Sequence, residues 1–489
     1  MVPGGVEPGA EVIYRSPLPA VDFPAATVHE HVLAGARRHG ERVALVDAVS
    51  AERLTYAELA GAVERTAKGL VADGVRPGDV VAISSMNRPH YAVALHAVMA
   101  AGATAALLNP VLTDGEARRL HALAHVTRTL DLDDLPVSDD GELPVTSPDD
   151  SAVILFSSGT TGVTKAVRHR HRALVANLEQ QRQGWRIGHT DVLAANLPFF
   201  HVYGFAIILE SGLLGGATIV TSPRCDAATY LRRLREHRVT RAFLVPPLAA
   251  AIAAETGAPE QPSLRLVLCG AAPLDENVRR AAERVLHAPI RQGYGLTEAG
   301  GTHQTFDDDL DADPASVGVL SPGTEARIVR PGTTEDVAEG EAGEMLVRGP
   351  QVMDGYVDDE EATRAAFADG WLRTGDLVRV VNGRFHVVDR IKEMIKYRGY
   401  QVAPAELEAV LRGHPRVSDA AVVGTPDRIN GEVPKAFVVT QGDVTAEELL
   451  AFVAAEVAPY KKVRQVVFVN EIPRSVSGKI LRRLLGDHP

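Results

Sequence analysis

Short apolar runs alternate with longer helical patterns through the first 290 residues of the chain. Val80–Ser84 is followed by the Ala-rich segment Pro89–Ala101, and the same order recurs along the chain. The further pairs are Ala217–Thr221 with Ala227–Glu236, Ala242–Val245 with Leu248–Glu255, and Leu264–Cys269 with Leu274–Val285. Strands that alternate with helices in this way pair in parallel, so the pattern predicts α/β sheets with helices on their faces.

The pattern of expected strands and helices changes twice after this region. From residue 314 to about 389, short strands are broken by Gly and Pro, and Asn382-Gly383 is a strong hairpin signal, so we expect a β-rich subdomain. After Asp389 a compact α+β unit follows. Its expected helices are Pro404–Leu411, Ala446–Val457 and Gly478–Leu485, and its expected strands are Val417–Val423 and Ala436–Val439. We predict a large N-terminal body of α/β sheets with that β-rich subdomain (1–391) and a small mobile C-terminal domain (392–489).

Composition limits the classes of function. Of the 489 residues, 45% are hydrophobic and 23% charged, which is a globular composition, and the net charge of −12 argues against a general binder of nucleic acid or anionic membranes. The uncharged stretch Pro89–Thr113 has too few strongly apolar residues for a membrane span, so we expect a buried helix and strand there. Cys225 and Cys269 have no metal-ligand spacing and favour a reducing cytoplasm.

An apolar strand beginning at Ala152 runs into a loop of hydroxyls and glycines that a lysine closes. The loop residues of interest are Ser157, Ser158, Gly159, Thr160, Thr161, Gly162 and Lys165. Glycines let backbone N–H groups approach phosphate oxygens, hydroxyls donate to those oxygens, and the ammonium balances their charge. The loop is not a Walker A sequence, because Thr164 precedes Lys165. The alternative interpretation is an ordinary turn.

Three other segments carry chemistry. Gln292–Glu298 places Gly293, Tyr294, Gly295, Thr297 and Glu298 on one turn, which could hold a purine, a phosphate and Mg²⁺. Gly370–Asp376 ends in an acid suited to ribose hydroxyls. Pro473–Lys479 places a lysine near the start of the expected last helix.

Together these motifs resemble the adenylate-forming superfamily, which includes acyl- and aryl-CoA synthetases, peptide-synthetase adenylation domains and beetle luciferases. The resemblance runs from the LTYAEL segment at Leu54–Leu59 to Lys479, in the family's order. Three segments look like those of 4-coumarate:CoA ligases. They are Pro198–Tyr203, Cys269–Leu274 and the DRIKEMIKYRGYQVAPAELE run at Asp389–Glu408.

The resemblance implies that a carboxylate attacks the α-phosphorus of ATP to give an acyl-adenylate and pyrophosphate, and that a thiol, by default that of CoA, then displaces AMP. Cations and donors around the developing charge should then dominate the rate enhancement. By resemblance, Ser157–Lys165 hold the β- and γ-phosphates, Thr297 contacts phosphate, and Glu298 binds Mg²⁺. Adenine lies between Tyr294 and the backbone of Gly270, Ala271 and Ala272, while Asp376 and Arg390 hold the ribose.

The same resemblance gives the C-terminal domain two working positions. In the first, Lys479 bridges the carboxylate and the α-phosphate. The domain then rotates about a hinge at Lys392, which removes Lys479 and brings up the face around Lys396 and Gln401 to position the adenylate beside a thiol tunnel. His201 gates or contacts the acyl site in this picture; the alternative is a hydrogen-bonded core histidine.

The sequence does not identify the acid substrate. Tyr203 either lines an aryl pocket and hydrogen-bonds a ring substituent, or only packs. After Gly300, the family commonly continues Pro-Val-Leu, whereas here Gly301, Thr302 and His303 precede Gln304. A flexible, polar continuation at the acyl-pocket wall favours an acid with a polar ring group; alternatively, His303 and Gln304 face solvent.

The sequence also does not identify the acceptor of the activated acid or the oligomeric state. No carrier or reductase domain follows Pro489, so we expect a stand-alone enzyme that works as a monomer or homodimer with small diffusible substrates. Besides CoA, the acceptor could be a carrier protein, an amine, or nitrite in an ATP-dependent diazotase acting on an aminoaryl acid. Luciferase-type oxygenation and a catalytically dead nucleotide-binding regulator are less favoured, the latter because every key ionisable residue is present.

Overall fold

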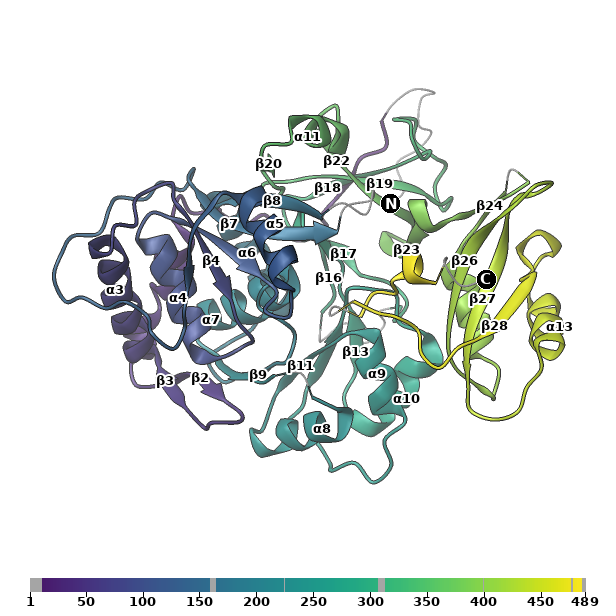
Figure 1. Ribbon diagram of the computed structural model, residues 1–489, viewed down its shortest axis with the longest axis horizontal. Helices are drawn as coiled ribbons and strands as arrows, with labels where there is room; N and C mark the ends of the chain where they lie inside the picture. Colours follow the sequence, from purple (N-terminus) through teal and green to yellow (C-terminus); the bar gives the residue numbers. More distant parts are fainter. Residues whose placement is uncertain are drawn as a thin grey trace.

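The structure is a computed structural model of the chain, and it describes residues 11–158, 164–223, 225–306, 313–398, 400–475 and 478–485. A large body of α/β sheets and a smaller C-terminal part make up the molecule (Figure 1). Two mostly parallel sheets form the interior of the body, as the alternation of strands and helices predicts.

The first of these sheets has seven strands in the order β13-β12-β11-β9-β10-β2-β3. All neighbours are parallel except β2 and β3. The strands are β13 (Ile290–Gln292), β12 (Leu266–Cys269), β11 (Arg241–Leu244), β9 (Val192–Ala195), β10 (Thr218–Thr221), β2 (Val43–Asp47) and β3 (Arg53–Thr55). Ala242 and Leu244 pack against α8 (Ala227–Glu236), α9 (Pro246–Ala253) and α10 (Glu276–Leu286). Phe243 belongs to the cluster on the opposite face, as the two-residue period of a strand requires.

The second sheet has six strands in the order β20-β8-β7-β5-β4-β6. Strands β7, β5, β4 and β6 run parallel, while β8 pairs antiparallel with both β7 and β20. The strands are β20 (Gly355–Tyr356), β8 (Thr164–Arg170), β7 (Ser151–Ser158), β5 (Thr104–Leu108), β4 (Val80–Ser84) and β6 (Val126–Leu130). Helix α5 (Asp114–Ala124) packs on its outer face.

A layer of helices lies between the two sheets and forms the largest core cluster with both of them. It contains α1 (Val28–Leu33), α2 (Ala36–His39), α3 (Tyr56–Ala72), α4 (Pro89–Ala100), α6 (His171–Trp185), the π-helix η1 (Tyr203–Glu210) and α7 (Ser211–Gly215). In α4 every residue except His90 is buried. This confirms the sequence interpretation of Pro89–Thr113 as a buried helix and strand, since β5 follows directly.

The β-rich region forms a sheet of its own, in the order β1-β18-β19-β22-β21 with β23 paired to β22. Its strands are β1 (Tyr14–Arg15), β18 (Glu325–Val329), β19 (Gly343–Arg348), β21 (Phe367–Ala368), β22 (Trp371–Val381) and β23 (Arg384–Arg390), and α11 (Glu360–Ala366) precedes β21. Asn382 and Gly383 both have positive φ, 52° and 74°, which confirms a two-residue hairpin turn of the expected kind. Strand β1 comes from the start of the chain, a recruitment that the sequence pattern does not indicate.

Four two-residue strands connect the sheets near the site: β14 (Gly295–Leu296) pairs with β15 (Gly300–Gly301), and β16 (His303–Gln304) pairs with β17 (Val319–Leu320). These short ladders carry the chain from β13 of the seven-stranded sheet into the β-rich region. They therefore place the Gln292–Glu298 segment between two sheets.

The C-terminal part is built on a sheet in the order β25-β24-β27-β26 with β28 beside β27. Its elements are η2 (Ile391–Glu393), β24 (Ile395–Tyr397), β25 (Tyr400–Val402), α12 (Pro404–Arg412), β26 (Val417–Asp427), β27 (Gly431–Thr440), α13 (Ala446–Glu456), η3 (Pro459–Lys461), β28 (Gln465–Phe468) and η4 (Arg482–Leu484). The two expected strands are therefore present and longer than predicted. The expected boundary at Lys392 falls inside η2 and stays a prediction.

The expected helix Gly478–Leu485 is wrong. Only the 3-10 turn η4 forms there, and Lys479 precedes it in a loop closed by a bridge between Arg474 and Ile480. Gly478 has φ of +84°, a left-handed conformation that is incompatible with a continuing right-handed helix. This last segment, yellow in Figure 1, runs back from the C-terminal sheet toward the body near β13 and α9.

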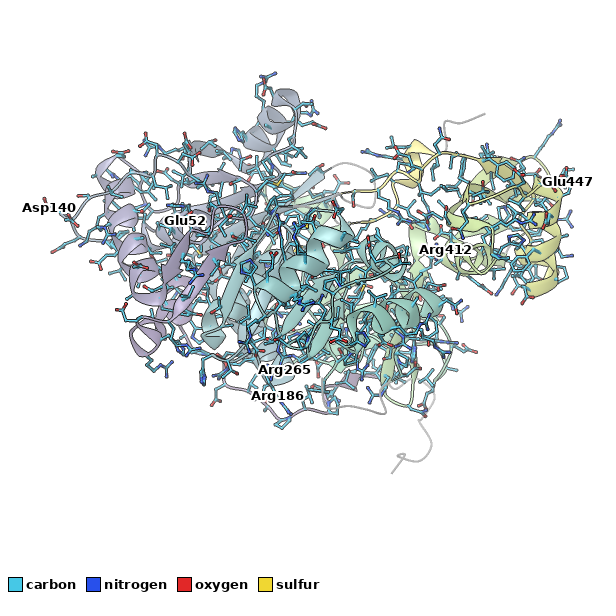
Figure 2. The ribbon with its side chains drawn as sticks, turned by 90° about the horizontal axis from the view of Figure 1, so that it is seen from below. Glu52, Asp140, Arg186, Arg265, Arg412 and Glu447 are labelled. Carbon is cyan, nitrogen blue, oxygen red and sulfur yellow. The ribbon has the colours of Figure 1, made fainter. Side chains whose placement is uncertain are left out.

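Charged side chains cover the outside of both parts. Asp140, Arg186, Arg265 and Glu447 are exposed examples that project from the surface in Figure 2. Within the ranges that the structure describes, no helix combines the length and the apolar character that crossing a membrane requires.

Buried histidines are an unusual feature of the helical layer. The ring of His171 meets that of His29 edge-on at 6.0 Å, and its Nδ1 accepts a hydrogen bond from the Val28 N–H at 3.1 Å. Burial lowers the pKa of both imidazoles to about 4. The unfolded chain therefore takes up these protons as the pH falls below about 6.5, while the folded protein does not until about pH 4, so folding stability is lost across this window.

We predict that acidification from pH 7 to pH 4.5 lowers the melting temperature, and that His171→Asn reduces this dependence. Asparagine can keep an acceptor for Val28 but does not titrate. For a shift from 6.5 to about 4, the limiting effect is roughly 3 kcal/mol for this fully buried side chain. Thermal unfolding followed by circular dichroism at each pH measures it, with His189→Asn at an exposed site as the control. Identical pH profiles for the wild type and His171→Asn would contradict the prediction.

Candidate active site

The strand pair β7–β8 supports the expected phosphate loop. Ser157 and Lys165 are direct cross-strand partners, and Ser158 pairs with Thr164. Gly159, Thr160, Thr161 and Gly162 lie outside the described residues, as does the side chain of Ser158. The hairpin thus brings the first hydroxyl of the motif and its closing lysine opposite each other.

The Glu298 carboxylate lies at the centre of a polar network. Ser157 Oγ donates a hydrogen bond to Glu298 Oε1 at 2.9 Å, and the Tyr356 hydroxyl donates to the same oxygen at 3.3 Å. The Lys165 ammonium lies 4.3 Å from the centre of the Tyr356 ring. Sequence analysis missed Tyr356, because a single Gly-Tyr dipeptide in a loop-rich region carries no recognisable pattern.

A buried histidine fixes the neighbouring residue. His169 Nε2 lies 2.7 Å from the Thr297 carbonyl oxygen, which can only accept, so Nε2 carries the proton. Burial lowers the pKa of His169, and the ring is neutral at physiological pH. The Thr297-Glu298 segment is therefore held by β8 as well as by β7.

Asp376 contacts both Tyr294, expected to bind adenine, and Arg390, expected to bind the ribose. The Tyr294 hydroxyl donates to Asp376 Oδ2 at 2.5 Å, and Arg390 Nε lies 3.0 Å from Asp376 Oδ1. Asp376 and Arg390 are cross-strand partners in β22–β23, so the sheet itself sets their ion pair. Asp376 is only 2% exposed, and the two partners compensate the burial of its charge.

The backbone of Gly270 packs against the Tyr203 ring. A Cβ on Gly270 would come within 3.2 Å of Tyr203 Cε1 and 3.5 Å of the Gly293 carbonyl oxygen. Ala271, next in the chain, has φ of +72°. Gly270 therefore lies between the Tyr203 ring and Gly293, where a side chain would be tightly placed, and Gly293 is the neighbour of Tyr294 in the chain.

The Tyr203 hydroxyl is already engaged. It donates to the Leu268 carbonyl oxygen at 2.9 Å, and the ring packs edge-on against Phe243 at 6.2 Å. The Tyr203 O–H group therefore cannot also donate a hydrogen bond to a substituent on the ring of the acid. Tyr203 presents an aromatic wall, and only a hydroxyl lone pair is left for a substrate.

His201 and Lys479 approach each other from different parts of the chain. Burial and the charge of Lys479 lower the pKa of His201 to about 4, so this imidazole is neutral. None of the residues described by the structure hydrogen-bonds its ring, and the nearest aromatic partner is Phe200 at 4.8 Å. This environment differs from that of a hydrogen-bonded core histidine.

Lys479 brings a cation from the C-terminal part to the body. The side chain keeps water-accessible surface, yet the protein around it is dense enough that burial lowers its pKa to about 8. Arg390 lowers this pKa further, whereas Asp376 and Glu298 raise it. The ammonium form therefore predominates at neutral pH, within the field of the Asp376 and Glu298 carboxylates.

Backbone contacts fix the Lys479 loop. The Ser475 N–H donates a hydrogen bond to the Lys479 carbonyl oxygen at 2.8 Å. A Cβ on Gly478 would lie 3.0 Å from Pro247 Cδ and 3.3 Å from Val245 Cγ2. The loop thus contacts the segment that begins α9 in the body.

Arg482 ties this loop to the start of the C-terminal part. Its guanidinium pairs with Glu393 at 2.7 Å and with Glu408 at 2.6 Å, and its Nε donates to the Val422 carbonyl at 3.1 Å. Glu393 directly follows Lys392. The position of Lys479 is therefore mechanically linked to the segment expected to act as the hinge.

The structure does not bring Lys396 and Gln401 to this site. They are cross-strand partners in the β24–β25 hairpin, and the Lys396 N–H donates to Glu432 Oε2 at 2.7 Å. The side chain of Gln401 lies outside the described residues. Among the described interactions, none joins Lys396 to Lys479, Asp376 or Glu298.

The segment after Gly300 is buried and hydrogen-bonded, so the expectation of a flexible continuation is wrong. Thr302, His303 and Gln304 are each at most 1% exposed, which also excludes the solvent-facing interpretation. His303 packs against Tyr294 and Phe385 at 5.3 and 4.5 Å, and burial lowers its pKa to about 3. Its Nδ1 lies 2.9 Å from the Thr302 hydroxyl.

Amide side chains of α6 hold the glycine pair. Gly301 donates to Asn177 Oδ1 at 3.1 Å, and its carbonyl accepts from Asn177 Nδ2 at 2.9 Å and from Gln181 Nε2 at 2.7 Å. A Cβ on Gly300 or Gly301 would clash with these amides, at 2.4 and 2.7 Å. Sequence analysis missed Asn177 and Gln181, because buried amides in a helix resemble an exposed polar face.

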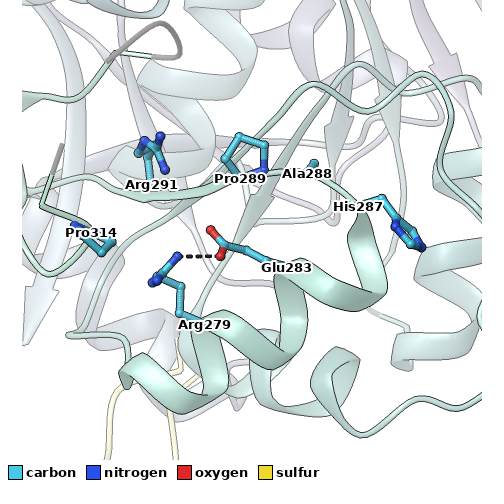
Figure 3. Close-up of a pocket in the computed structure, with 7 residues that line it drawn as sticks. All are labelled: Arg279, Glu283, His287, Ala288, Pro289, Arg291 and Pro314. Carbon is cyan, nitrogen blue, oxygen red and sulfur yellow. Dashed lines mark hydrogen bonds and ion pairs between the residues drawn. The ribbon is translucent and has the colours of Figure 1, made fainter. Parts of the chain in front are cut away.

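An open cavity of about 490 Å³ lies elsewhere, between α10 and β13. Figure 3 shows its lining: Arg279, Glu283, His287, Ala288, Pro289, Arg291 and Pro314. Arg279 pairs with Glu283 at 2.5 Å and with Glu276 at 2.8 Å. None of the expected site residues lines this cavity, and its ion pairs are those of a charged surface.

Comparison with known proteins agrees with this arrangement. The model of the AMP-binding enzyme family matches residues 33–357, and that of the AMP-binding enzyme C-terminal domain matches residues 406–479. The 4-coumarate--CoA ligase-like 4 of Oryza sativa subsp. japonica is 39% identical over 91% of this chain and 90% of its own.

Two solved structures share the fold over nearly the whole chain. ATP-bound MatB from Rhodopseudomonas palustris superimposes with a TM-score of 0.89 at 26% identity, covering 95% of this chain and 99% of its own. The o-succinylbenzoate CoA synthetase MenE from Bacillus subtilis, in complex with the acyl-adenylate OSB-AMP, gives a TM-score of 0.84 at 30% identity, with coverages of 95% and 99%. The chain belongs to the AMP-binding enzyme family of AMP-forming acid–thiol ligases.

Proposed function

We propose that this protein activates an aryl or cinnamic acid with ATP as the acyl-adenylate and then transfers the acyl group to CoA. The observation that carries the proposal is the position of Lys479, which lies in the field of Asp376, Arg390 and Glu298 although it comes from the C-terminal part of the chain. Two anions must meet in the first half-reaction, and a compact ammonium at their meeting point lowers the repulsion between them.

The groups for ATP are proposed from the family resemblance, and the contacts within the site support them. Ser157 and Lys165, with Ser158–Gly162 between them, take the β- and γ-phosphates, and Thr297 contacts phosphate. Tyr294, Gly293, Gly295 and the Gly270–Ala272 backbone hold adenine. Asp376 and Arg390 hold the ribose, because each Asp376 oxygen accepts one partner and a carboxylate oxygen can accept a second.

The residues around Glu298 fit Mg²⁺, the metal of this family. Glu298 Oε1 accepts both hydrogen bonds, from Ser157 and Tyr356, while Oε2 has no partner among the described residues. The described residues contain no group of three or more His, Cys, Asp or Glu that could hold a metal alone. A single carboxylate that shares the ion with substrate phosphates is the usual magnesium arrangement in proteins. Bound Mg²⁺ would neutralise charge on those phosphates.

The two half-reactions then use different ends of the C-terminal part. In the first, the acid's carboxylate oxygen bonds to the α-phosphorus and pyrophosphate leaves. In the second, the CoA sulfur bonds to the acyl carbon and AMP leaves. For this second step we propose rotation about Lys392, which withdraws Lys479 and brings Lys396 and Gln401 to the adenylate.

The acid class follows from the walls beside His201. The Tyr203 ring offers an aromatic face, and the buried segment Gly300–Thr302, held by amides of α6, contributes no charged side chain. His201 is neutral, so it can contact the acyl group without an unpaired charge. Such a lining favours a flat aryl acid, which is also what the name of the rice relative suggests.

A mass-spectrometric product assay tests the proposal. The enzyme receives ATP, Mg²⁺ and panels of benzoic, cinnamic, aminoaryl and fatty acids, with CoA, with nitrite or with neither. We expect a CoA ester of an aryl or cinnamic acid together with AMP. AMP formation that requires nitrite and yields no CoA ester would keep the adenylation step and overturn the acceptor. No AMP with any acid would refute the function.

We predict opposite effects for two lysine variants. Lys479→Ala should lower adenylation at least 100-fold, measured by ATP–pyrophosphate exchange, and leave thioester formation from a supplied acyl-adenylate nearly unchanged. Lys396→Ala should do the reverse, because its face is needed only after rotation. Equal losses in both half-reactions for either variant would contradict the assigned role of that lysine.

We also predict that Gly478→Ala impairs adenylation selectively. The new Cβ would lie 3.0 Å from Pro247, and φ of +84° strains any residue with a Cβ. The contact with Pro247 exists only while Lys479 is in the body, so ATP–pyrophosphate exchange should fall about tenfold and transfer to CoA much less. Gly442→Ala, at φ of +138° with open space around it, controls for backbone strain alone. A matched loss in the control would contradict the prediction.

A further inference from the structure

Tyr356 contacts two groups that the proposed function places on the phosphates and the metal, although no motif includes it. Its hydroxyl donates to Glu298 Oε1 at 3.3 Å, and the Lys165 ammonium lies 4.3 Å from its ring centre. An ammonium over an aromatic face is attracted by the ring quadrupole, and a hydroxyl on a carboxylate fixes which oxygen is left open. One side chain thus touches the closing lysine of the phosphate hairpin and the carboxylate for Mg²⁺.

The backbone around Tyr356 is held firmly enough to position it. Strand β20 pairs with β8 through Gly355–Arg168 and Tyr356–Val167. Just before it, Asp354 forms ion pairs with Arg168 at 2.8 Å and with Arg170 at 2.7 Å. Both guanidinium groups lower the pKa of Asp354 against the effect of its burial, so this carboxylate is charged at neutral pH.

Two further hydrogen bonds complete the support. The Tyr356 N–H donates to Thr363 Oγ1 at 3.0 Å. The Met353 N–H donates to the Glu298 carbonyl oxygen at 2.8 Å. The segment Met353–Tyr356 therefore holds Glu298 twice, through its backbone and through its carboxylate, while the same segment is anchored to the strand that carries Lys165.

We propose that Tyr356 is a positioning residue that sets the Lys165 ammonium and the Glu298 carboxylate in place for the magnesium complex of ATP. This inference rests on the proposed function, because that function assigns the metal to Glu298 and the phosphates to Lys165. The hydroxyl acts on the metal side and the ring acts on the phosphate side. The two contributions are separable by substitution.

The test is a binding experiment without turnover. Isothermal titration calorimetry measures the affinity for α,β-methylene ATP, which cannot transfer its adenylyl group, with Mg²⁺ and with EDTA, and for AMP, which lacks the distal phosphates. Tyr356→Phe removes only the hydroxyl, and Tyr356→Leu removes the hydroxyl and the ring. Tyr14→Phe, in β1 far from these contacts along the chain, is the matched control, and melting temperatures check folding.

We expect Tyr356→Phe to weaken binding of the magnesium complex about fivefold and to leave binding in EDTA unchanged. Tyr356→Leu should in addition weaken binding in EDTA about fivefold, because the ring that holds Lys165 is lost. AMP affinity should stay at the wild-type value in both variants. Tyr14→Phe should match the wild type throughout.

Other outcomes overturn the inference. Wild-type affinities in both variants would show that Tyr356 positions neither group, and an equal loss for AMP would show a general structural role. Glu298→Gln separates this inference from the proposed function. If Glu298→Gln abolishes the gain from Mg²⁺ and Tyr356→Phe leaves that gain at its wild-type value, the metal assignment stands and the role of Tyr356 falls. If the wild-type protein gains nothing from Mg²⁺, the metal assignment falls and the inference with it.

Discussion

The Glu298 carboxylate lies where the sheets of the body meet. It follows β13 of the seven-stranded sheet by a few residues, and it is held by Ser157 from the six-stranded sheet. Tyr356, on the short strand that joins the β-rich region to that sheet, supplies the other donor. A carboxylate that is shared in this way couples the orientation of the two large sheets to one polar point. Small changes in how the sheets pack would be felt there first, because packed interiors shift as units.

The charges around this point are balanced partly within the body and partly by the C-terminal part of the chain. Asp376 is compensated by Arg390 from the adjacent strand, and the excess negative charge of Glu298 and Asp376 favours an incoming ammonium. Lys479 supplies it at the expense of its own solvation, as the lowered pKa shows. Arg482, paired with Glu393 and Glu408, keeps the loop of Lys479 attached to the beginning of the C-terminal part. The arrangement suits a cation that is needed for one step and is absent from the next.

The sequence predicts much of this architecture for clear physical reasons. Val80–Ser84 and Ala227–Glu236 match their observed elements residue for residue, since their apolar periods are unambiguous. The expected helix at Gly478–Leu485 fails because tertiary contact with Pro247 and the left-handed Gly478 override a local pattern of leucines and arginines. The segment Gly301–Gln304 looks polar and mobile in sequence, yet the partners that bury it, Asn177 and Gln181, lie more than a hundred residues away. Tyr356 could not be predicted for the same reason, because the side chains that it contacts, Lys165 and Glu298, lie far from it in the sequence.

The contact between Gly478 and Pro247 has a consequence for how fast the two parts can separate. Gly478 contributes no side chain to its contact with Pro247, whose Cδ lies 3.0 Å from the position that a Cβ would take. Separation at this point requires no rotamer change and no unthreading of interlocked groups. In the proposed function, the acid's carboxylate loses its negative charge when the acyl-adenylate forms, so the attraction between Lys479 and the substrate weakens after the first half-reaction. Completion of the first half-reaction would then itself favour separation of the Lys479 loop from the body.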